Sequence, residues 1–281
     1  MTNLDLNLMQ DVLAVAEAAG RDIMAIYADA SRWAVQTKCD DSPLTAADVA
    51  AHHRIVAGLS ALASAWGQLP VLSEESSAAE LAERHDWSAC WVVDPLDGTK
   101  EFIARNGEFS VNIALVVNDA AVLGIVHGPA IGVSYVAAKG LGSFRVDASG
   151  WHRIHTAALP VRGERPIRLT VSRRHGLEQL RQFEQAISDN FGAVQSVPAG
   201  SAFKICAVAE GLADAYPRFG PTSEWDTAAA QVVLEEAGGH LLDKQGRPFC
   251  YNRRDTLLNA GFLAVGREPQ RWLSYWPAQP K

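Results

Sequence analysis

The stretch WVVDPLDGTKEF, residues 91–102, holds the side chains with the clearest potential for chemistry. It begins as an apolar, β-branched run, which predicts a buried strand. It then places Asp94 and Asp97 on either side of Pro95. Because proline fixes its own φ and lacks an amide hydrogen, we expect the strand to end here. Gly98 permits a sharp turn and a close approach by a ligand.

The stretch therefore predicts two carboxylates at a strand end, beside the free amides of a short helix that begins near residue 100. Carboxylates bind hard cations such as Mg²⁺, and free amides bind phosphate oxygens. The same residue types are common in surface turns, so a plain turn is the alternative interpretation. A second acidic pair, Glu74-Glu75, and a second Trp-Asp step, Trp225-Asp226, favour chemistry over a plain turn.

The hexapeptide DPLDGT at residues 94–99 resembles the signature of the lithium-sensitive, magnesium-dependent phosphatases. That superfamily includes inositol monophosphatases, fructose-1,6-bisphosphatases and 3′(2′),5′-bisphosphate nucleotidases. The continuation Lys100-Glu101-Phe102 is similar to the nucleotidase branch (CysQ-type), whereas the inositol branch tends to continue Thr-Asn-Phe.

The resemblance implies a centre of two or three Mg²⁺ ions, because clustered carboxylates cannot all stay ionised without cations. It also implies a water that Thr99 and Asp48 orient or deprotonate, with Glu74 as the third catalytic residue. The implied metal ligands are the Leu96 carbonyl oxygen and the carboxylates of Asp48, Glu74, Glu75, Asp94, Asp97 and Asp226.

Two of these carboxylates also have ordinary structural interpretations. Thr45 is a predicted cap for a helix that carries residues 47–59, and Asp48 would then compensate the dipole of its first turn. Asp226 is predicted to begin an Ala-rich helix that reaches Ala237, where an aspartate commonly serves as the N-cap.

Substrate contacts are implied mainly in the second half of the chain. The sequence reads Gly-Ser-Ala-Phe-Lys at residues 200–204, where the nucleotidases usually read Gly-Ser-Ser-Leu-Lys, which leaves the adenosine contacts open. Arg218 is the candidate for a second phosphate, because a guanidinium fits phosphate oxygens in a bidentate way. The expected substrate-binding residues are Asp97, Gly98, Thr99, Ser172, Gly200, Ser201, Lys204, Arg218 and Asp226.

The implied reaction is hydrolysis of 3′-phosphoadenosine 5′-phosphate to AMP and phosphate, by in-line attack of a metal-activated water. The same chemistry on an inositol monophosphate or a fructose bisphosphate is one alternative. A non-catalytic regulator that binds metal or phosphate is the other.

The implied fold joins α+β and α/β parts in a layered αβαβα sandwich of the sugar and inositol phosphatase type. Residues 1–155 would form an N-terminal half with most metal ligands, and residues 156–281 a half with Asp226 and the substrate contacts. The sequence pattern alone indicates a long amphipathic helix over Leu6–Tyr27 and several strands before Pro160, two of them paired through a turn at Asn118-Asp119. It also indicates a mobile surface segment at residues 77–88 and a connection between the halves at 147–166.

Composition restricts the setting and the partners. The chain has 281 residues, is 48% hydrophobic and 20% charged, and carries a net charge of −7, which disfavours nucleic-acid binding. No apolar run approaches the roughly 20 residues of a membrane span. The first twenty residues contain no Lys or Arg, which argues against a signal peptide, and the four cysteines are widely spaced. We therefore expect a cytoplasmic protein with a small phosphorylated nucleotide as its partner; association with the inner membrane and a homodimer both stay open.

Overall fold

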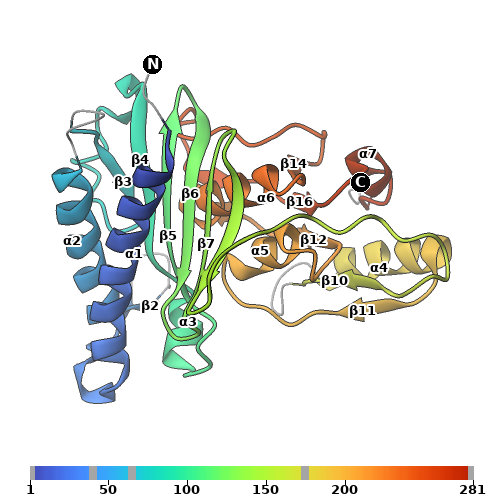
Figure 1. The fold of residues 1–281 in the computed structure, drawn as a ribbon, viewed down its shortest axis with the longest axis horizontal. Helices are drawn as coiled ribbons and strands as arrows, with labels where there is room; N and C mark the ends of the chain where they lie inside the picture. The colour runs from blue at the N-terminus through green and yellow to red at the C-terminus, as the bar shows by residue number, and fades with distance from the viewer. Residues whose placement is uncertain (1–3, 38–42, 63–67, 172–176, 278–281) are drawn as a thin grey trace.

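The computed structural model describes residues 4–37, 43–62, 68–171 and 177–277, and it forms five layers (Figure 1). Two outer helices cover one face of a seven-stranded sheet, two helices lie between this sheet and a five-stranded sheet, and two more cover the far face. This order confirms the predicted layered αβαβα sandwich. The helices, in that order of layers, are α1 (Leu6–Tyr27), α2 (Ala46–Ala61), α5 (Phe203–Ala209), α6 (Glu224–Glu236), α4 (Leu177–Phe191) and α7 (Pro269–Leu273).

The larger sheet has the strand order β3-β4-β5-β6-β7-β8-β9, with β3 parallel to β4 and the other neighbours antiparallel. Asn118 and Asp119, with φ of 48° and 68°, form the predicted turn between β5 and β6. The strands are β3 (Val71–Ser73), β4 (Ala89–Asp97), β5 (Ser110–Val117), β6 (Ala120–Gly128), β7 (Val133–Ala138), β8 (Gly142–Asp147) and β9 (Gly150–Arg153). Strand β9 lies inside the segment that was predicted to be a connection. The sequence did not indicate this strand, because it forms by hairpin pairing with β8 and carries little apolar signal.

The smaller sheet has the order β11-β10-β12-β16-β14, and two further strand pairs lie outside both sheets. Its strands are β10 (Ile167–Leu169), β11 (Val194–Ser196), β12 (Ala215–Arg218), β14 (His240–Asp243) and β16 (Phe262–Val265). The two pairs are β1 (Gln36–Thr37) with β2 (Pro43–Leu44), and β13 (Thr222–Ser223) with β15 (Leu258–Asn259). None of the described helices combines the length and the apolar character that crossing a bilayer requires.

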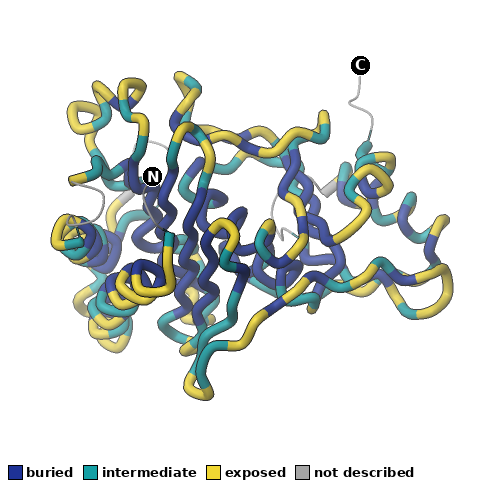
Figure 2. Tube along the Cα trace, turned by 45° about the horizontal axis from the view of Figure 1, so that its top comes forward, coloured by how far each residue is buried: buried dark blue, intermediate teal, exposed yellow. Residues whose placement is uncertain are grey.

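The middle hydrophobic core is shared by the two halves of the chain. Figure 2 shows the buried residues gathered in the interior of the molecule. Val92 of β4 and Val116 of β5 belong to the same buried cluster as Ala229 of α6. At Gly124 of β6, any side chain would collide with the carbonyl oxygen of Ala229, so α6 packs directly on the larger sheet. This close packing fixes the start of α6 against the end of β4.

Strand β4 does not end at Pro95, as the sequence suggested, but continues to Asp97. Its register with β5 shifts between Asp94, which pairs with Asn112, and Asp97, which pairs with Ser110. Three steps along β4 therefore match two along β5, as in a β-bulge, and such an irregularity tolerates a proline.

The segment at residues 77–88 lies largely on the surface, as the sequence suggested, but it includes one buried residue. Arg84 is 6% exposed, and its guanidinium donates hydrogen bonds to the carbonyl oxygens of Arg254 and Asp255 at 2.7 and 2.6 Å. These partners are distant in the sequence, so local polarity could not reveal the contact.

Candidate metal centre and substrate cavity

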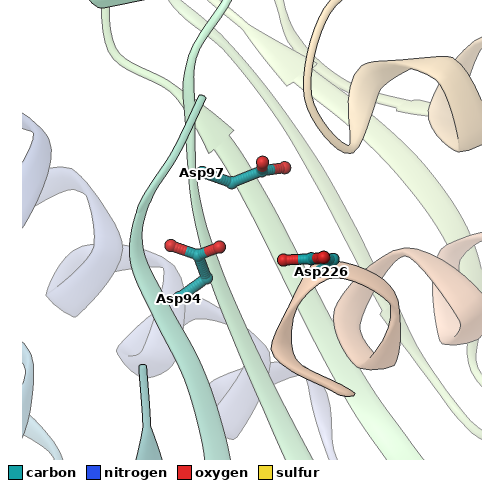
Figure 3. Close-up of side chains that lie close together, drawn as sticks. All are labelled: Asp94, Asp97 and Asp226. Atoms are coloured by element: carbon teal, nitrogen blue, oxygen red, sulfur yellow. The ribbon is translucent and has the colours of Figure 1, made fainter. Parts of the chain in front are cut away.

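Three carboxylates meet where the end of β4 faces the start of α6 (Figure 3). Asp94, Asp97 and Asp226 each offer one oxygen, and these oxygens all lie within 4.8 Å of one another. Asp94 is 1% exposed, and the other two residues are half-buried. The sequence-based expectation that the acidic residues of two distant motifs come together is met in this geometry.

The bulge in β4 and its neighbours set the direction of the two β4 carboxylates. The Leu96 amide donates to Asp94 Oδ1 at 3.0 Å. Asp97 Oδ2 accepts hydrogen bonds from the Ser201 hydroxyl, from the Ala202 amide at 2.7 Å and from Asn112 Nδ2 at 3.3 Å. Asp97 is thus held by both halves of the chain.

Asn112 of β5 is a polar partner of the site that the sequence analysis did not select. Its carboxamide is 1% exposed, and its Oδ1 accepts from the Ser110 hydroxyl at 2.9 Å. The signal that identifies this pair is the placement of two polar residues at i and i+2 in a buried strand, which puts both on one face.

Asp226 and Asp48 occupy equivalent places in two helices. Each is the third helical residue of a capping box, so Asp226 Oδ2 accepts from the Ser223 amide at 2.7 Å and Asp48 Oδ2 from the Thr45 amide at 2.7 Å. The N-cap of α6 is Ser223 rather than Asp226, because the helix begins two residues earlier than the sequence suggested. Capping uses one carboxylate oxygen of two, so it is compatible with the predicted ligand role.

Of the two glutamates expected as ligands, Glu74 lies near the three aspartates and Glu75 does not line their cavity. Glu74 follows β3, its amide donates to the Val93 carbonyl at 3.1 Å, and its charge acts on Asp94. Glu75 does not line the cavity that the three aspartates border, and its charge acts on His52. The cavity, of about 460 Å³, is lined by Pro43, Glu74, Asp94, Leu96, Asp97, Gly98, Thr99, Lys100, Glu101, Ser223, Trp225 and Asp226.

Thr99 connects this cavity with Asp48. Its hydroxyl Oγ1 lies 3.3 Å from Asp48 Oδ1 and 3.4 Å from the Leu96 carbonyl oxygen. Gly98, with φ of 94°, turns the chain between Asp97 and the five-residue helix α3 (Thr99–Ile103). The left-handed conformation there favours glycine over residues with side chains.

The electrostatics of the group fit a divalent cation. Burial raises the pKa of Asp94 well above its usual range, and the neighbouring charges of Glu74 and Asp97 raise it further. Burial, followed by the charge of Asp97, raises the pKa of Asp226 to about 8. The negative charges of these carboxylates repel one another, and a bound Mg²⁺ would neutralise them through its oxygen ligands. The residues present therefore fit this ion.

A second cavity, of about 260 Å³, adjoins the first and shares five lining residues with it: Asp97, Gly98, Lys100, Glu101 and Asp226. Its own lining adds the cationic side chains of Lys204 and Arg218 and the carboxylate of Glu108. Lys204 Nζ donates to the Ser201 carbonyl at 2.9 Å, and burial lowers the pKa of its ammonium. The arrangement places positive charge beside a cluster of carboxylates, as a substrate with more than one phosphate would require.

Loop geometry decides the shape of this second cavity. A side chain at Gly200 would lie 2.7 Å from the carbonyl oxygen of Glu108, so glycine is required by close approach. Ser201 has a φ of 50° and lines the cavity. Substrate contacts at both residues remain predictions. Ser172, the other predicted contact in this region, lies outside the described residues.

The sequence matches the model of the inositol monophosphatase family over residues 8–273. The chain belongs to this family. As a member of the inositol monophosphatase family, it is similar to the 3′(2′),5′-bisphosphate nucleotidase CysQ of Shigella flexneri, with 43% identity over 255 residues. That match covers 91% of this chain and 98% of the relative. The nucleotidase CysQ of Haemophilus influenzae is 34% identical over 274 residues, which is 98% of both chains.

Two solved structures show the same architecture. The crystal structure of CysQ from Bacteroides thetaiotaomicron has a TM-score of 0.79 and 36% identity, covering 95% of this chain and 100% of that one. The extragenic suppressor protein suhB from Bartonella henselae has a TM-score of 0.77 at 24% identity, with 96% and 98% of the two chains covered. The second likeness concerns the fold alone.

Metal-free protein is expected to lose stability as the pH rises. The pKa values of Asp94 and Asp226 are higher in the folded protein than the unfolded value of about 3.9. Their contribution to stability is therefore fully present below about pH 4 and is lost as the pH rises through the folded values, about 8 for Asp226. We expect the Tm in EDTA to fall across this interval, as a thermal-shift series in pH would show.

Magnesium is expected to reverse this loss. Binding at a hundred times Kd contributes about 2.7 kcal/mol. Since 1 kcal/mol shifts the Tm by about 2–4 °C in a chain of this size, saturating Mg²⁺ should raise the Tm at pH 8 by about 5–10 °C. Sodium chloride at matched ionic strength is the control. A Tm that is the same in EDTA and in Mg²⁺ would contradict the metal assignment.

Proposed function

We propose that this chain is a Mg²⁺-dependent 3′(2′),5′-bisphosphate nucleotidase that hydrolyses 3′-phosphoadenosine 5′-phosphate to AMP and phosphate. The observation that carries the proposal is the junction of two cavities that share Asp97 and Asp226: the first holds the carboxylate group, and the second adds Lys204 and Arg218 beside those carboxylates. A bisphosphorylated nucleotide needs both a hydrolytic centre and a cationic site for the phosphate that is kept. The similarity to CysQ nucleotidases along almost the whole chain supports the same substrate class.

The carboxylates of Glu74, Asp94, Asp97 and Asp226, with the Leu96 carbonyl oxygen, would hold two or three Mg²⁺ ions. When bound, Mg²⁺ polarises the phosphoryl group, lowers the pKa of a bound water and stabilises the leaving oxygen.

The residues of the chain would prepare the water for in-line attack. Because the Thr99 hydroxyl donates a hydrogen bond to Asp48 Oδ1, the lone pairs of the Thr99 oxygen stay available to accept a hydrogen bond from a water. Asp48 is itself fixed by its capping box, so its direction does not depend on substrate. Thr99 and Asp48 thus form a proton-accepting path at the edge of the metal cavity.

Replacement of Arg218 by alanine is expected to reduce selectivity for the bisphosphate. The guanidinium holds the following turn, with Nε 3.3 Å from the Gly220 carbonyl and Nη2 3.1 Å from that of Pro221, and it lines the second cavity. A charge-assisted contact to the retained phosphate is worth roughly 1.5–3 kcal/mol, or about one to two decades in affinity. KM for 3′-phosphoadenosine 5′-phosphate should therefore rise far more than KM for 3′-AMP.

The matched control for this prediction is Arg247→Ala, which removes an exposed guanidinium paired with Asp243. It should leave both KM values unchanged. If Arg218→Ala instead raises both KM values equally and lowers the Tm, the arginine serves only the turn, and Lys204 becomes the candidate for phosphate selectivity.

Lithium is expected to inhibit the magnesium-dependent reaction. Li⁺ is close to Mg²⁺ in size but carries half its charge, so it can occupy a carboxylate site without stabilising the leaving oxygen. Initial rates at fixed Mg²⁺ should fall as LiCl is added in the millimolar range, whereas equal NaCl should have little effect. Equal rates in the two salts would argue against this mode of metal use.

A parallel assay on three substrates tests the proposed function. Phosphate release from 3′-phosphoadenosine 5′-phosphate, inositol 1-phosphate and fructose 1,6-bisphosphate would be measured with the same enzyme at saturating Mg²⁺. The proposal requires the highest kcat/KM for the nucleotide.

We also propose a cytoplasmic setting, because the described cysteines, Cys90, Cys206 and Cys250, are free thiols.

A further inference from the structure

The loop that leads into β15 crosses the start of α6, the helix that carries Asp226. This loop with the two residues of β15, residues 251–259, is here named the strap. Its hydrogen bonds to the first turns of α6 involve the side chains of Tyr251, Arg254 and Asn259, the backbone amide of Asn252 and the Leu257 carbonyl, which accepts from the Glu224 amide at 2.9 Å. The strap therefore fixes the end of α6 that faces the metal cavity.

Glu224, the first residue of α6, is the strap's main partner. Its side chain is fully buried, Oε2 accepts from the Asn252 amide at 2.6 Å, and Oε1 accepts from Arg254 Nη2 at 3.0 Å. Residues two apart on an α-helix are turned by about 200°. Glu224 thus holds α6 from the side opposite to Asp226.

A second route runs from the same arginine to Asp226. Arg254 Nη2 donates to Asn259 Oδ1 at 2.7 Å, and Asn259 Nδ2 donates to the Ser223 carbonyl at 2.9 Å. Ser223 is the N-cap residue whose amide binds Asp226 Oδ2. Arg254 therefore acts on both the back of the helix and the cap that directs the carboxylate.

The strap is also tied to the N-terminal half. Asn252 Nδ2 donates to the Arg84 carbonyl at 2.6 Å, and Arg84 Nη1 lies 3.2 Å from Asn252 Oδ1. Arg84 lies in the segment between β3, which leads to Glu74, and β4, which carries Asp94. The two sets of metal ligands are thus connected through one polar network behind the site.

We propose that Glu224 and Arg254 are positioning residues for the metal centre, which set the place of Asp226 relative to Asp94 and Asp97. Neither side chain is among those lining the two described cavities, so they act through α6 rather than on metal or substrate. The inference rests on the proposed role of the carboxylates in binding Mg²⁺. Residues that orient metal ligands typically change metal affinity by 10–100-fold when they are replaced.

The test uses two variants and measures Mg²⁺ binding directly by calorimetry and by the Mg²⁺-induced rise in Tm. Glu224→Gln keeps the size of the side chain and removes its charge. Arg254→Met removes the donors from a side chain that is 37% exposed. Each variant should weaken Mg²⁺ binding by about 10-fold or more. The KM for nucleotide at saturating Mg²⁺ should not change, because Lys204 and Arg218 remain in place.

The matched control is Asp214→Asn. Asp214 is equally an acid buried between arginines, 2.6 Å from Arg165 and 3.1 Å from Arg168, and it precedes β12 at the end away from Arg218. This variant should lose stability while its Mg²⁺ affinity stays at the wild-type value. The double variant of Glu224 and Arg254 should bind Mg²⁺ as each single variant does, because partners in one network are not additive.

Wild-type Mg²⁺ affinity in Glu224→Gln and Arg254→Met, together with a lowered Tm like that of Asp214→Asn, would overturn the inference. If Glu224→Gln does not fold, Arg254→Met decides alone. Absence of Mg²⁺ binding in the wild type would overturn both the inference and the proposed function. Normal binding without nucleotide hydrolysis would overturn the proposed function alone.

Discussion

Asp94→Asn is expected to abolish phosphatase activity while the fold is kept. Asp94 is the most buried member of the carboxylate group, and Glu74, Asp97, Asp226 and Asp48 all act on its charge. Asparagine has the same shape but cannot balance a divalent cation. We expect a loss of about 10³-fold or more in kcat/KM, which corresponds to at least about 4 kcal/mol of transition-state stabilisation.

The stability of this variant distinguishes a metal ligand from a structural acid. In EDTA at pH 8, Asp94→Asn should melt no lower than the wild type, because it removes an ionisable group from a buried position where the charged form is disfavoured. In Mg²⁺, the wild type should gain stability and the variant should gain less. Circular dichroism, phosphate release and Tm would be measured on the same preparations. Near-normal turnover by a folded Asp94→Asn protein would refute the metal assignment.

The parts of the fold that the sequence predicted have strong local signals. Helix α1 begins and ends where the helical spacing of apolar residues indicated, because one face of twenty-two residues is buried against the sheet and Asp5 caps its start. The hairpin of β5 and β6 followed from alternating strands around Asn118 and Asp119. The motif at residues 94–99 pointed to two of the three carboxylates that lie together, although its strand continues through the proline.

The order in which the strands of the smaller sheet pair could not be predicted in this way. The sequence indicated strands at residues 167–171, 241–242 and 260–265, where β10, β14 and β16 lie, but strands of three or four residues carry no signal that fixes their partners. Strand β12 includes Pro217, which pairs with Leu263 of β16, and a proline ordinarily argues against an inner strand. Tertiary pairing decides the conformation there. The sequence therefore indicated a mixed fold, and the resemblance to a family was needed to indicate the layers.

The contrast between local signals and tertiary contacts also applies to the site. Asp226 meets Asp94 because α6 packs on β6 at Gly124, and no local pattern contains that contact. The hydrogen bonds of Asn112 to Asp97 and of Arg84 to the strap join residues that are far apart in the sequence. Long-range polar contacts of this kind follow from packing, so sequence reasoning points to the clustered carboxylates but not to the groups that hold them.

Thr99→Val is expected to reduce kcat strongly while Mg²⁺ binding is kept. Valine has nearly the shape of threonine but lacks the hydroxyl that lies 3.3 Å from Asp48 Oδ1. General acid–base groups contribute about 10²- to 10⁴-fold to rates, and a loss in this range is expected if the hydroxyl orients the water. Single-turnover rates of phosphate release at saturating Mg²⁺ would measure it.

Thr99→Ser is the matched control, because serine restores the hydroxyl without the methyl group. Asp48→Asn is a poorer test, since Asp48 Oδ2 also accepts from the Thr45 hydroxyl and amide at 2.6 and 2.7 Å, and its loss would disturb the start of α2. If serine retains most of the rate that valine loses, the hydroxyl carries the effect. If both variants lose the rate equally and keep their Mg²⁺ affinity, the methyl group positions the loop and the path through Asp48 is wrong.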